Sequence, residues 1–138
     1  MIKRISFLVV ILLAGCSSTK KNSVVEPLFS IIKSNQEQGG TFLFFETITE
    51  KNEFSMLAND PDLKNSIASN DISTCNYALI NLGAKSDSGY TISISLVAET
   101  TDKIVLKITE IKPLTINFEG SNPLFIIKVR SKKSLELQ

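Results

Sequence analysis

The sequence predicts a small domain of the α+β class that is mainly β: an antiparallel sheet of five to six strands, forming a sandwich or a partly open barrel, with one or two short helices. Short apolar runs recur along the chain and are separated by turn-forming residues. Two of these runs alternate apolar and polar residues on either side of a polar bend, as in an antiparallel hairpin with one buried face. With 138 residues, 43% hydrophobic and 21% charged, the chain suits a single globular domain, which we expect at residues 24–138.

The first half of this domain is expected to hold two strands and a helix. In chain order we expect a strand (or a short helix) near residues 28–33, a turn at 35–40, a strand at 41–48, a helix at 50–57, and a loop at 59–74 with an optional helical turn at 63–68. Thr49 can cap the helix, and Glu50 suits the positive end of its dipole. Phe54 and Leu57 then form an apolar pair on one face. An early helix therefore interrupts a pattern that is otherwise β.

The second half carries the clearest strand signals. We expect strands at residues 77–82, 90–96, 104–108 and 124–129, the middle two forming the hairpin around the bend at 99–102. The apolar positions of that hairpin, predicted to face the core, are Tyr90, Ile92, Ile94, Leu96, Ile104, Leu106 and Ile108. The basic segment at 130–133 is interpreted as a solvated tail, with contact to anionic lipid as the alternative.

The N-terminus has the organisation of a bacterial lipoprotein export signal. Lys3 and Arg4 precede an apolar run at residues 5–13, which is too short to span a membrane as a helix. Leu-Ala-Gly-Cys at 13–16 matches the lipobox, in which the Cys16 thiol takes a diacylglycerol and the chain is cut just before it. We therefore expect a signal peptide at residues 1–15.

The same reading places the mature protein on a membrane. Lipidated Cys16 and the small polar residues up to 23 form a flexible tether, and two or three acyl chains give a stable anchor. Ser17 stands where an Asp would signal retention in the inner membrane. We therefore predict a lipid-anchored envelope protein, with membrane lipid as one partner and the periplasmic or surface face of the outer membrane favoured.

The residue types needed for common catalytic and metal sites are scarce. The chain has no His, and once Cys16 is acylated Cys75 is the one thiol left. We interpret Cys75 as a small apolar residue, with an intermolecular bridge or reactive thiol as the alternative. Asp60 and Asp62 are interpreted as part of a solvated turn rather than a calcium or acid–base pair. Without these residue types we expect no catalytic site, metal or cofactor. The mature chain holds 13 basic and 14 acidic residues, so we expect no nucleic-acid partner.

The segment before the hairpin carries the most specific pattern. Residues 82–90 read Leu-Gly-Ala-Lys-Ser-Asp-Ser-Gly-Tyr, in which the glycines allow tight backbone angles and Asp or Ser can bond the turn. Together with the hairpin and a last strand introduced by Pro123, this resembles the C-terminal domain of the PrcB-type protease-complex subunits. That family has a Leu-Gly-x-Lys-like turn followed by a Thr-Gly-Gly-Tyr-like stretch. The resemblance covers about residues 76–129.

The resemblance implies a non-catalytic accessory role, because members of that family are envelope proteins and one associates with a surface subtilisin-like protease. The candidate binding loop consists of Lys85, Asp87, Ser88, Gly89 and Tyr90, acting together with a sheet edge; a plain turn at the hairpin entry is the alternative. We therefore predict an accessory or assembly subunit that binds another envelope protein, with a protease as one candidate. The alternatives are an envelope enzyme with a Ser or carboxylate site, and a protease-inhibitor-like binding module.

Overall fold

The computed structural model describes residues 24–138, so the predicted signal peptide, Cys16 and the tether lie outside the described residues. The elements in chain order are β1 (Phe29–Asn35), β2 (Leu43–Ile48), α1 (Lys51–Ala58), the 3-10 turns Pro61–Leu63 and Asp71–Ser73, β3 (Asn76–Leu82), β4 (Thr91–Glu99), β5 (Lys103–Ile111), β6 (Leu124–Val129) and β7 (Ser134–Leu137). The predicted fold class, mainly β with one short helix, is confirmed.

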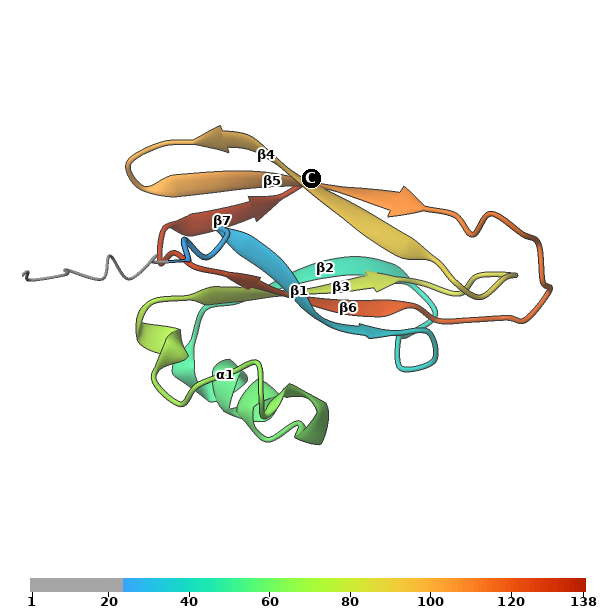
Figure 1. Ribbon diagram of the computed structural model, residues 1–138, viewed down its shortest axis with the longest axis horizontal. Coiled ribbons are helices and arrows are strands. Elements are labelled where there is room, and N and C mark those ends of the chain that lie inside the picture. The colour runs from blue at the N-terminus through green and yellow to red at the C-terminus, as the bar shows by residue number, and fades with distance from the viewer. Residues whose placement is uncertain (1–23) are drawn as a thin grey trace, which may run out of the picture.

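The strands form two sheets that do not close into a barrel (Figure 1). The four-stranded sheet has the order β1-β6-β3-β2 and is antiparallel throughout. The second sheet has the order β4-β5-β7, in which β5 pairs antiparallel with β4 and parallel with β7. Residues 24–138 therefore form seven strands in two sheets, one more strand than the largest number predicted, and the extra strand is β7.

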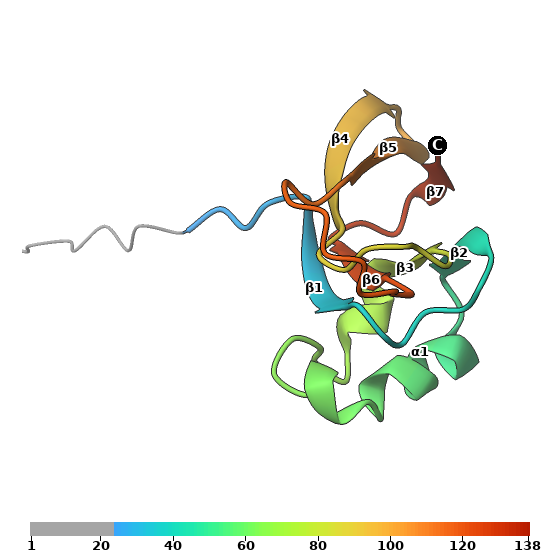
Figure 2. The same cartoon turned by 90° about the vertical axis from the view of Figure 1, so that its right-hand side faces the viewer.

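The main core lies between the two sheets. Alternate side chains of the four-stranded sheet, such as Ile80 and Phe125, meet Ile104 and Leu106 from the second sheet, and all four are buried. A second cluster lies on the opposite face of the four-stranded sheet, where α1 and the segment that follows it cover the strands (Figure 2). The four-stranded sheet is thus covered on both faces, which explains the nearly continuous burial of β3.

The hairpin of β4 and β5 is confirmed, although its alternation holds over only part of β4. Ile92 is buried and Ile94 half-buried, as predicted, but Leu96 and Val97 are both exposed. The pairing register shifts between Leu96 and Ala98, which places an extra residue in β4 and interrupts the period of two.

Two local expectations are wrong in detail, and one is confirmed. The residue preceding α1 is Glu50 rather than Thr49, and it makes no side-chain capping bond. The helical turn expected at 63–68 is present, since the Ile67 N–H donates to the Leu63 carbonyl at 3.1 Å, and the 3-10 turn Pro61–Leu63 precedes it. The C-terminal end is not a solvated tail, because β7 pairs with β5 and the Lys132 Nζ donates to Asn76 Oδ1 at 2.8 Å.

Candidate functional site

Three loops meet at one end of the molecule. They are residues 36–42 between β1 and β2, residues 83–90 between β3 and β4, and residues 112–122 between β5 and β6. We call these three loops the distal tip, because Val24, where the described chain begins, lies at the opposite end of the long axis (Figure 1). The predicted binding loop is thus one of three segments that form a common surface.

Gln36 joins two of these loops through its side-chain amide. Its Oε1 accepts from the backbone N–H groups of Gly89 and Tyr90, at 2.9 and 3.1 Å, and its Nε2 donates to the Tyr90 carbonyl at 2.9 Å. The Gln36 carbonyl also accepts from the Asn122 N–H at 2.7 Å, which brings in the third loop. One residue therefore holds all three loops in register.

Asp87 and Asn117 form the second connection. The Asp87 Oδ1 accepts from the N–H groups of Asn117 and Phe118, at 3.0 and 2.9 Å. The Asn117 side chain in turn accepts from the Ser88 N–H and donates to the Ser88 carbonyl. The hydrogen bonds from the Phe118 and Asn117 amides hold the pKa of Asp87 below its usual value. The carboxylate is therefore ionised at neutral pH and keeps residues 117–118 in place.

Lys85 is tied down at both its backbone and its side chain. Its backbone exchanges two hydrogen bonds with Ser121, at 2.8 and 3.0 Å. Its ammonium group lies 2.7 Å from Glu110 and 5.3 Å from the centre of the Tyr90 ring. The positive charge of Lys85 is thus already paired within the protein, with Glu110 and the Tyr90 ring.

Several of the predicted binding residues are buried or hydrogen-bonded within the protein, where they support the neighbouring loop. Tyr90 is 7% exposed and packs in the core between the sheets, so its ring is a packing residue rather than part of the surface. Gly89 has a φ of 99°, which favours glycine, and its N–H is bonded to Gln36. Whether the loop contacts a partner stays a prediction, but the segment that it supports, residues 112–122, is the more exposed one.

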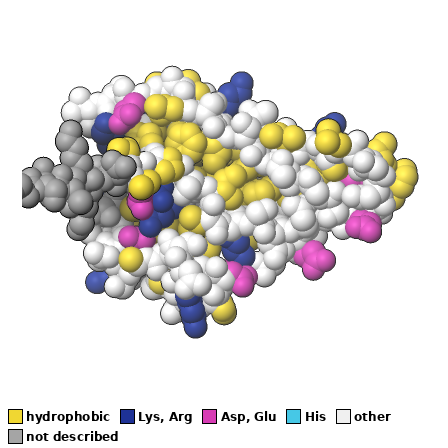
Figure 3. All heavy atoms as spheres, in the orientation of Figure 1, with side chains coloured by type: hydrophobic (Ala, Val, Ile, Leu, Met, Phe, Trp, Pro, Cys, Tyr) yellow, Lys and Arg dark blue, Asp and Glu magenta, His cyan; other side chains and the backbone are white. Residues whose placement is uncertain are grey.

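Residues 112–122 carry the exposed apolar side chains of the tip, and none of these side chains was singled out from the sequence. Leu114 is fully exposed, Ile116 is 68% exposed and Phe118 is 83% exposed. Yellow side chains accordingly gather at the narrow end of the molecule in Figure 3. A signal was present in the sequence, because every second residue between Pro113 and Gly120 is apolar. The stretch is too short to be predicted as a buried strand.

Phe118 combines this exposure with an unusual backbone. Its φ of 55° is the one positive value at a non-glycine residue within residues 24–138. For a bulky residue this region costs about 1–3 kcal/mol. Because the Phe118 ring is mostly in water, its burial offsets little of this cost. The hydrogen bonds to Asp87 hold the backbone in this strained conformation, in which the aromatic ring is exposed to solvent.

The outer edge of β2 adds further apolar surface. Within the described chain β2 pairs with β3 alone, so its other edge has unpaired backbone groups. The side chains of Phe42, Leu43 and Phe44 are all exposed along this strand and the residue before it. The strand has neither the lysine nor the proline that often protects an edge from pairing with another chain.

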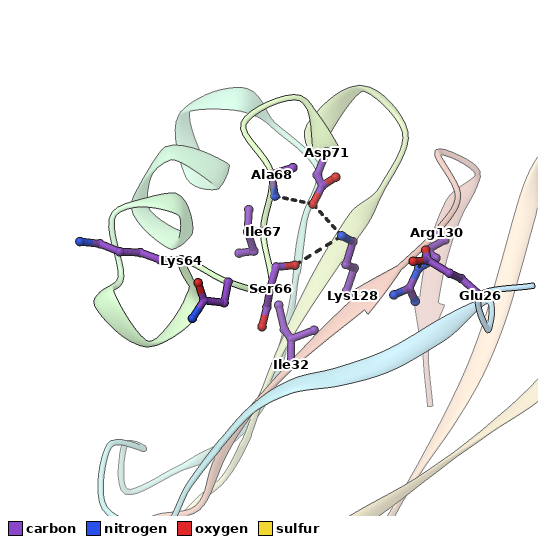
Figure 4. Close-up of a pocket in the computed structure, with 10 residues that line it drawn as sticks. Glu26, Ile32, Lys64, Ser66, Ile67, Ala68, Asp71, Lys128 and Arg130 are labelled. Carbon is purple, nitrogen blue, oxygen red and sulfur yellow. Dashed lines mark hydrogen bonds and ion pairs between the residues drawn. The ribbon is translucent and has the colours of Figure 1, made fainter. Parts of the chain in front are cut away.

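A cavity lies away from the tip, between β6 and the segment that follows α1. It has a volume of about 590 Å³, and Lys128, Arg130 and Asp71 are among its lining residues. Figure 4 shows Lys128 pointing towards Asp71 and Ser66, with Arg130 beside Glu26. The Asp71 Oδ2 accepts from Lys128 Nζ at 2.6 Å and from the Ala68 N–H at 2.8 Å.

The charges of this cavity stabilise the fold. Burial raises the pKa of Asp71, but the bonds from Lys128 and Ala68 outweigh it, so the pKa lies below its usual value. Burial and the Asp71 charge raise the pKa of Tyr77, whose hydroxyl lies 3.1 Å from Asp71. Asp71 is therefore ionised and Tyr77 protonated at neutral pH. Neither titrates near pH 7, where a general acid or base works best.

The other polar residues singled out in the sequence have ordinary partners. Lys33 lies 2.6 Å from Asp60 and 3.2 Å from Asp62, which accounts for both carboxylates. Cys75 is a free thiol, 5% exposed in the cluster beneath α1. Residues 24–138 contain no group of three His, Cys, Asp or Glu side chains placed to hold a metal ion. They also contain no helix of the length and hydrophobicity needed to span a membrane.

Comparison with known proteins gives no match: no protein-family model, curated protein or solved structure is detectably similar to this chain. The resemblance to the PrcB-type subunits therefore stays a prediction from sequence patterns.

Proposed function

We propose that this protein is a lipid-anchored, non-catalytic accessory or assembly subunit that binds another envelope protein, such as a protease, through its distal tip. The observation that carries the proposal is the set of apolar side chains at Leu114, Ile116 and Phe118, exposed on loops that hydrogen bonds hold together.

The energetics of the tip favour a binding role. Exposed apolar side chains contribute no hydrophobic stabilisation in the free protein. Burying them against a partner would provide that stabilisation and so favour binding. Because Gln36 and Asp87 already fix the loops, a partner would not have to order them on binding. Preorganisation of this kind lowers the entropic cost of association.

The position of the tip fits the proposed anchor. The described chain starts at Val24, at the end opposite the tip (Figure 1). A lipid on Cys16 would therefore attach the domain by the end opposite the tip. The free edge of β2 lies along the side of the molecule and could accept an extended segment of the same partner.

Binding is also favoured over catalysis by the state of the largely buried charged groups that line the cavity. Asp71 and Lys128 are bonded to each other, and their side chains are only 15% and 13% exposed. We therefore prefer an accessory subunit to an enzyme with a Ser or carboxylate site.

The proposal is tested with the full-length chain in its native envelope. We expect a partner protein to co-purify with the wild type after mild detergent extraction, and to be lost from the double variant Leu114→Ser with Ile116→Ser. Met56→Ser is the matched control, because Met56 is 77% exposed but lies on α1. Equal recovery from the tip variant and the control would refute binding through the tip.

The anchor is tested separately with Cys16→Ala. We expect this change to abolish labelling by radioactive palmitate and to release the protein from the membrane fraction. Unchanged labelling and fractionation would contradict the lipoprotein proposal while leaving the tip proposal standing.

A further inference from the structure

We propose that Phe118 is the anchor residue of the tip, that it enters an apolar pocket rimmed by basic side chains on the partner protein, and that Asp87 is the residue that positions it. This inference rests on the proposed function and names both the contact residue and the chemistry of its receptor.

Phe118 combines an exposed side chain with a backbone conformation that does not favour folding. Its side chain is 83% exposed while its backbone has the positive φ that bulky residues avoid. Glycine or asparagine would adopt that backbone more readily. Aromatic side chains, in contrast, are enriched among the few residues that dominate protein–protein binding. An exposed ring on a strained backbone is thus explained by binding and not by folding.

Asp87 holds the backbone at Phe118 in place before any partner arrives. Its carboxylate accepts from the amides of both Asn117 and Phe118, so the peptide unit that precedes Phe118 cannot rotate freely. Asp87 is itself held, because the Ser121 hydroxyl donates to its carbonyl at 2.5 Å. The loop predicted from sequence as a binding site therefore acts through its neighbour.

The charge of the tip indicates the chemistry of the receptor. Over residues 36–42, 83–90 and 112–122 there are three acidic and two basic side chains, a formal charge of −1: Glu37, Asp87 and Glu119 against Lys85 and Lys112. Lys85 is already paired with Glu110 of β5, which leaves the three acidic side chains against Lys112 alone. An anionic lipid surface would repel this tip, whereas a protein pocket with Lys or Arg at its rim would complement it.

The experiment uses a photo-cross-linking amino acid, benzoylphenylalanine, in the full-length chain within its native envelope. It is placed at position 118, at position 114, and at position 56 on α1 as the control. Cross-linked products are identified by mass spectrometry, including the residue modified on the other molecule.

We expect the probe at 118 to label one protein, at an apolar position flanked by Lys or Arg, and the probe at 56 not to label it. Phospholipid adducts as the main product would overturn the inference. So would a labelled site without basic neighbours, or equal labelling from position 56. With the probe at 114, Phe118→Gly should lower the yield about tenfold or more.

The positioning role has its own readout. Asp87→Ala should raise hydrogen exchange at the amides of residues 117–118 and lower the yield from the probe at 118. Asp87→Asn retains an acceptor oxygen and should restore the amide protection, while the labelling stays reduced through loss of the charge. If Asp87→Ala leaves both the exchange and the yield unchanged, Asp87 does not position the ring. If Asp87→Ala is too unstable to test, the anchor role of Phe118 can still be tested by comparing the yield from the probe at 114 with and without Phe118→Leu. Position 118 is exposed, so this variant should fold.

The two proposals can fail separately. If the probe at 114 labels a partner to the same extent with and without Phe118→Gly, the tip still binds a protein, but Phe118 is not its anchor. If neither 114 nor 118 labels any protein, binding through the tip is refuted as well.

Discussion

Asp71 and Asp87 make similar contacts in opposite parts of the molecule. Each carboxylate accepts a backbone N–H, and each has a pKa held below its usual value. Asp71 is largely buried, and it bonds Lys128 and the Tyr77 hydroxyl beneath α1. Asp87 lies at the tip and bonds two amides of an exposed loop. The first carboxylate joins parts of the core, and the second holds a loop whose side chains face water.

The two aspartates therefore have different roles: Asp71 stabilises the folded protein, and Asp87 holds an exposed loop in its conformation. Loss of a buried ion-pair partner leaves an uncompensated charge inside the protein, which is expensive. Loss of an acceptor at the surface exposes amides that water can satisfy, so the cost falls on the shape of one loop. We therefore expect substitutions near Asp71 to affect unfolding, and those near Asp87 to affect the local structure and binding.

The largest effect is expected for Asp71→Ala. It leaves Lys128 without its carboxylate and should lower the free energy of unfolding by about 3 kcal/mol, measured by urea denaturation. Asp62→Ala is the matched control, because Asp62 is 62% exposed and Lys33 retains Asp60. The control should change stability by less than about 1 kcal/mol. Similar losses in both variants would contradict the structural role of Asp71.

The pH dependence of stability provides a second test of the same carboxylate. Because the pKa of Asp71 is lower in the folded than in the unfolded protein, its contribution is present above the unfolded value of about 3.9 and is lost as the pH falls through the folded value. The unfolding free energy of the wild type should therefore decrease below about pH 4. Asp71→Asn should lose less stability over that range, and parallel curves would be inconsistent with this account.

A smaller global effect is expected for Asp87→Ala. The variant should unfold with a stability much closer to that of the wild type than Asp71→Ala, because the released amides lie at the surface. Hydrogen exchange at residues 117–118 should nevertheless increase severalfold, while β3 and β6 stay protected. A global loss as large as that of Asp71→Ala would remove the distinction between the two aspartates.

The sequence allowed the fold class, most strands and the hairpin to be predicted, because alternation and turn residues are local signals. It did not predict β7, which is four residues long and pairs in parallel with β5, a contact set by the rest of the fold. Leu135 and Leu137 carry the alternation of that strand, but they follow a basic segment typical of a solvated tail.

The candidate site was predicted only in part. The pattern at residues 83–90 pointed to the end of the molecule where we propose the binding surface, since glycines and a turn-forming Asp mark a constrained loop. Tyr90 was predicted both as a core position of the hairpin and as a member of the binding loop, because aromatic residues next to glycine occur both in loops and at the start of buried strands. The core position is confirmed, since the ring enters the core. The partnership of Asp87 with Phe118 spans 31 residues of sequence, and no local pattern reports a contact of that kind.

The most direct test of the central claim is a paired measurement on Phe118→Gly. Glycine relieves the positive φ, so the account predicts a free energy of unfolding about 0.5 kcal/mol higher than that of the wild type, with Phe118→Ala showing no such gain. In the same membranes, recovery of the partner protein should fall. A variant that is no more stable than Phe118→Ala, or that retains its partner in full, would contradict the claim that Phe118 is strained for binding.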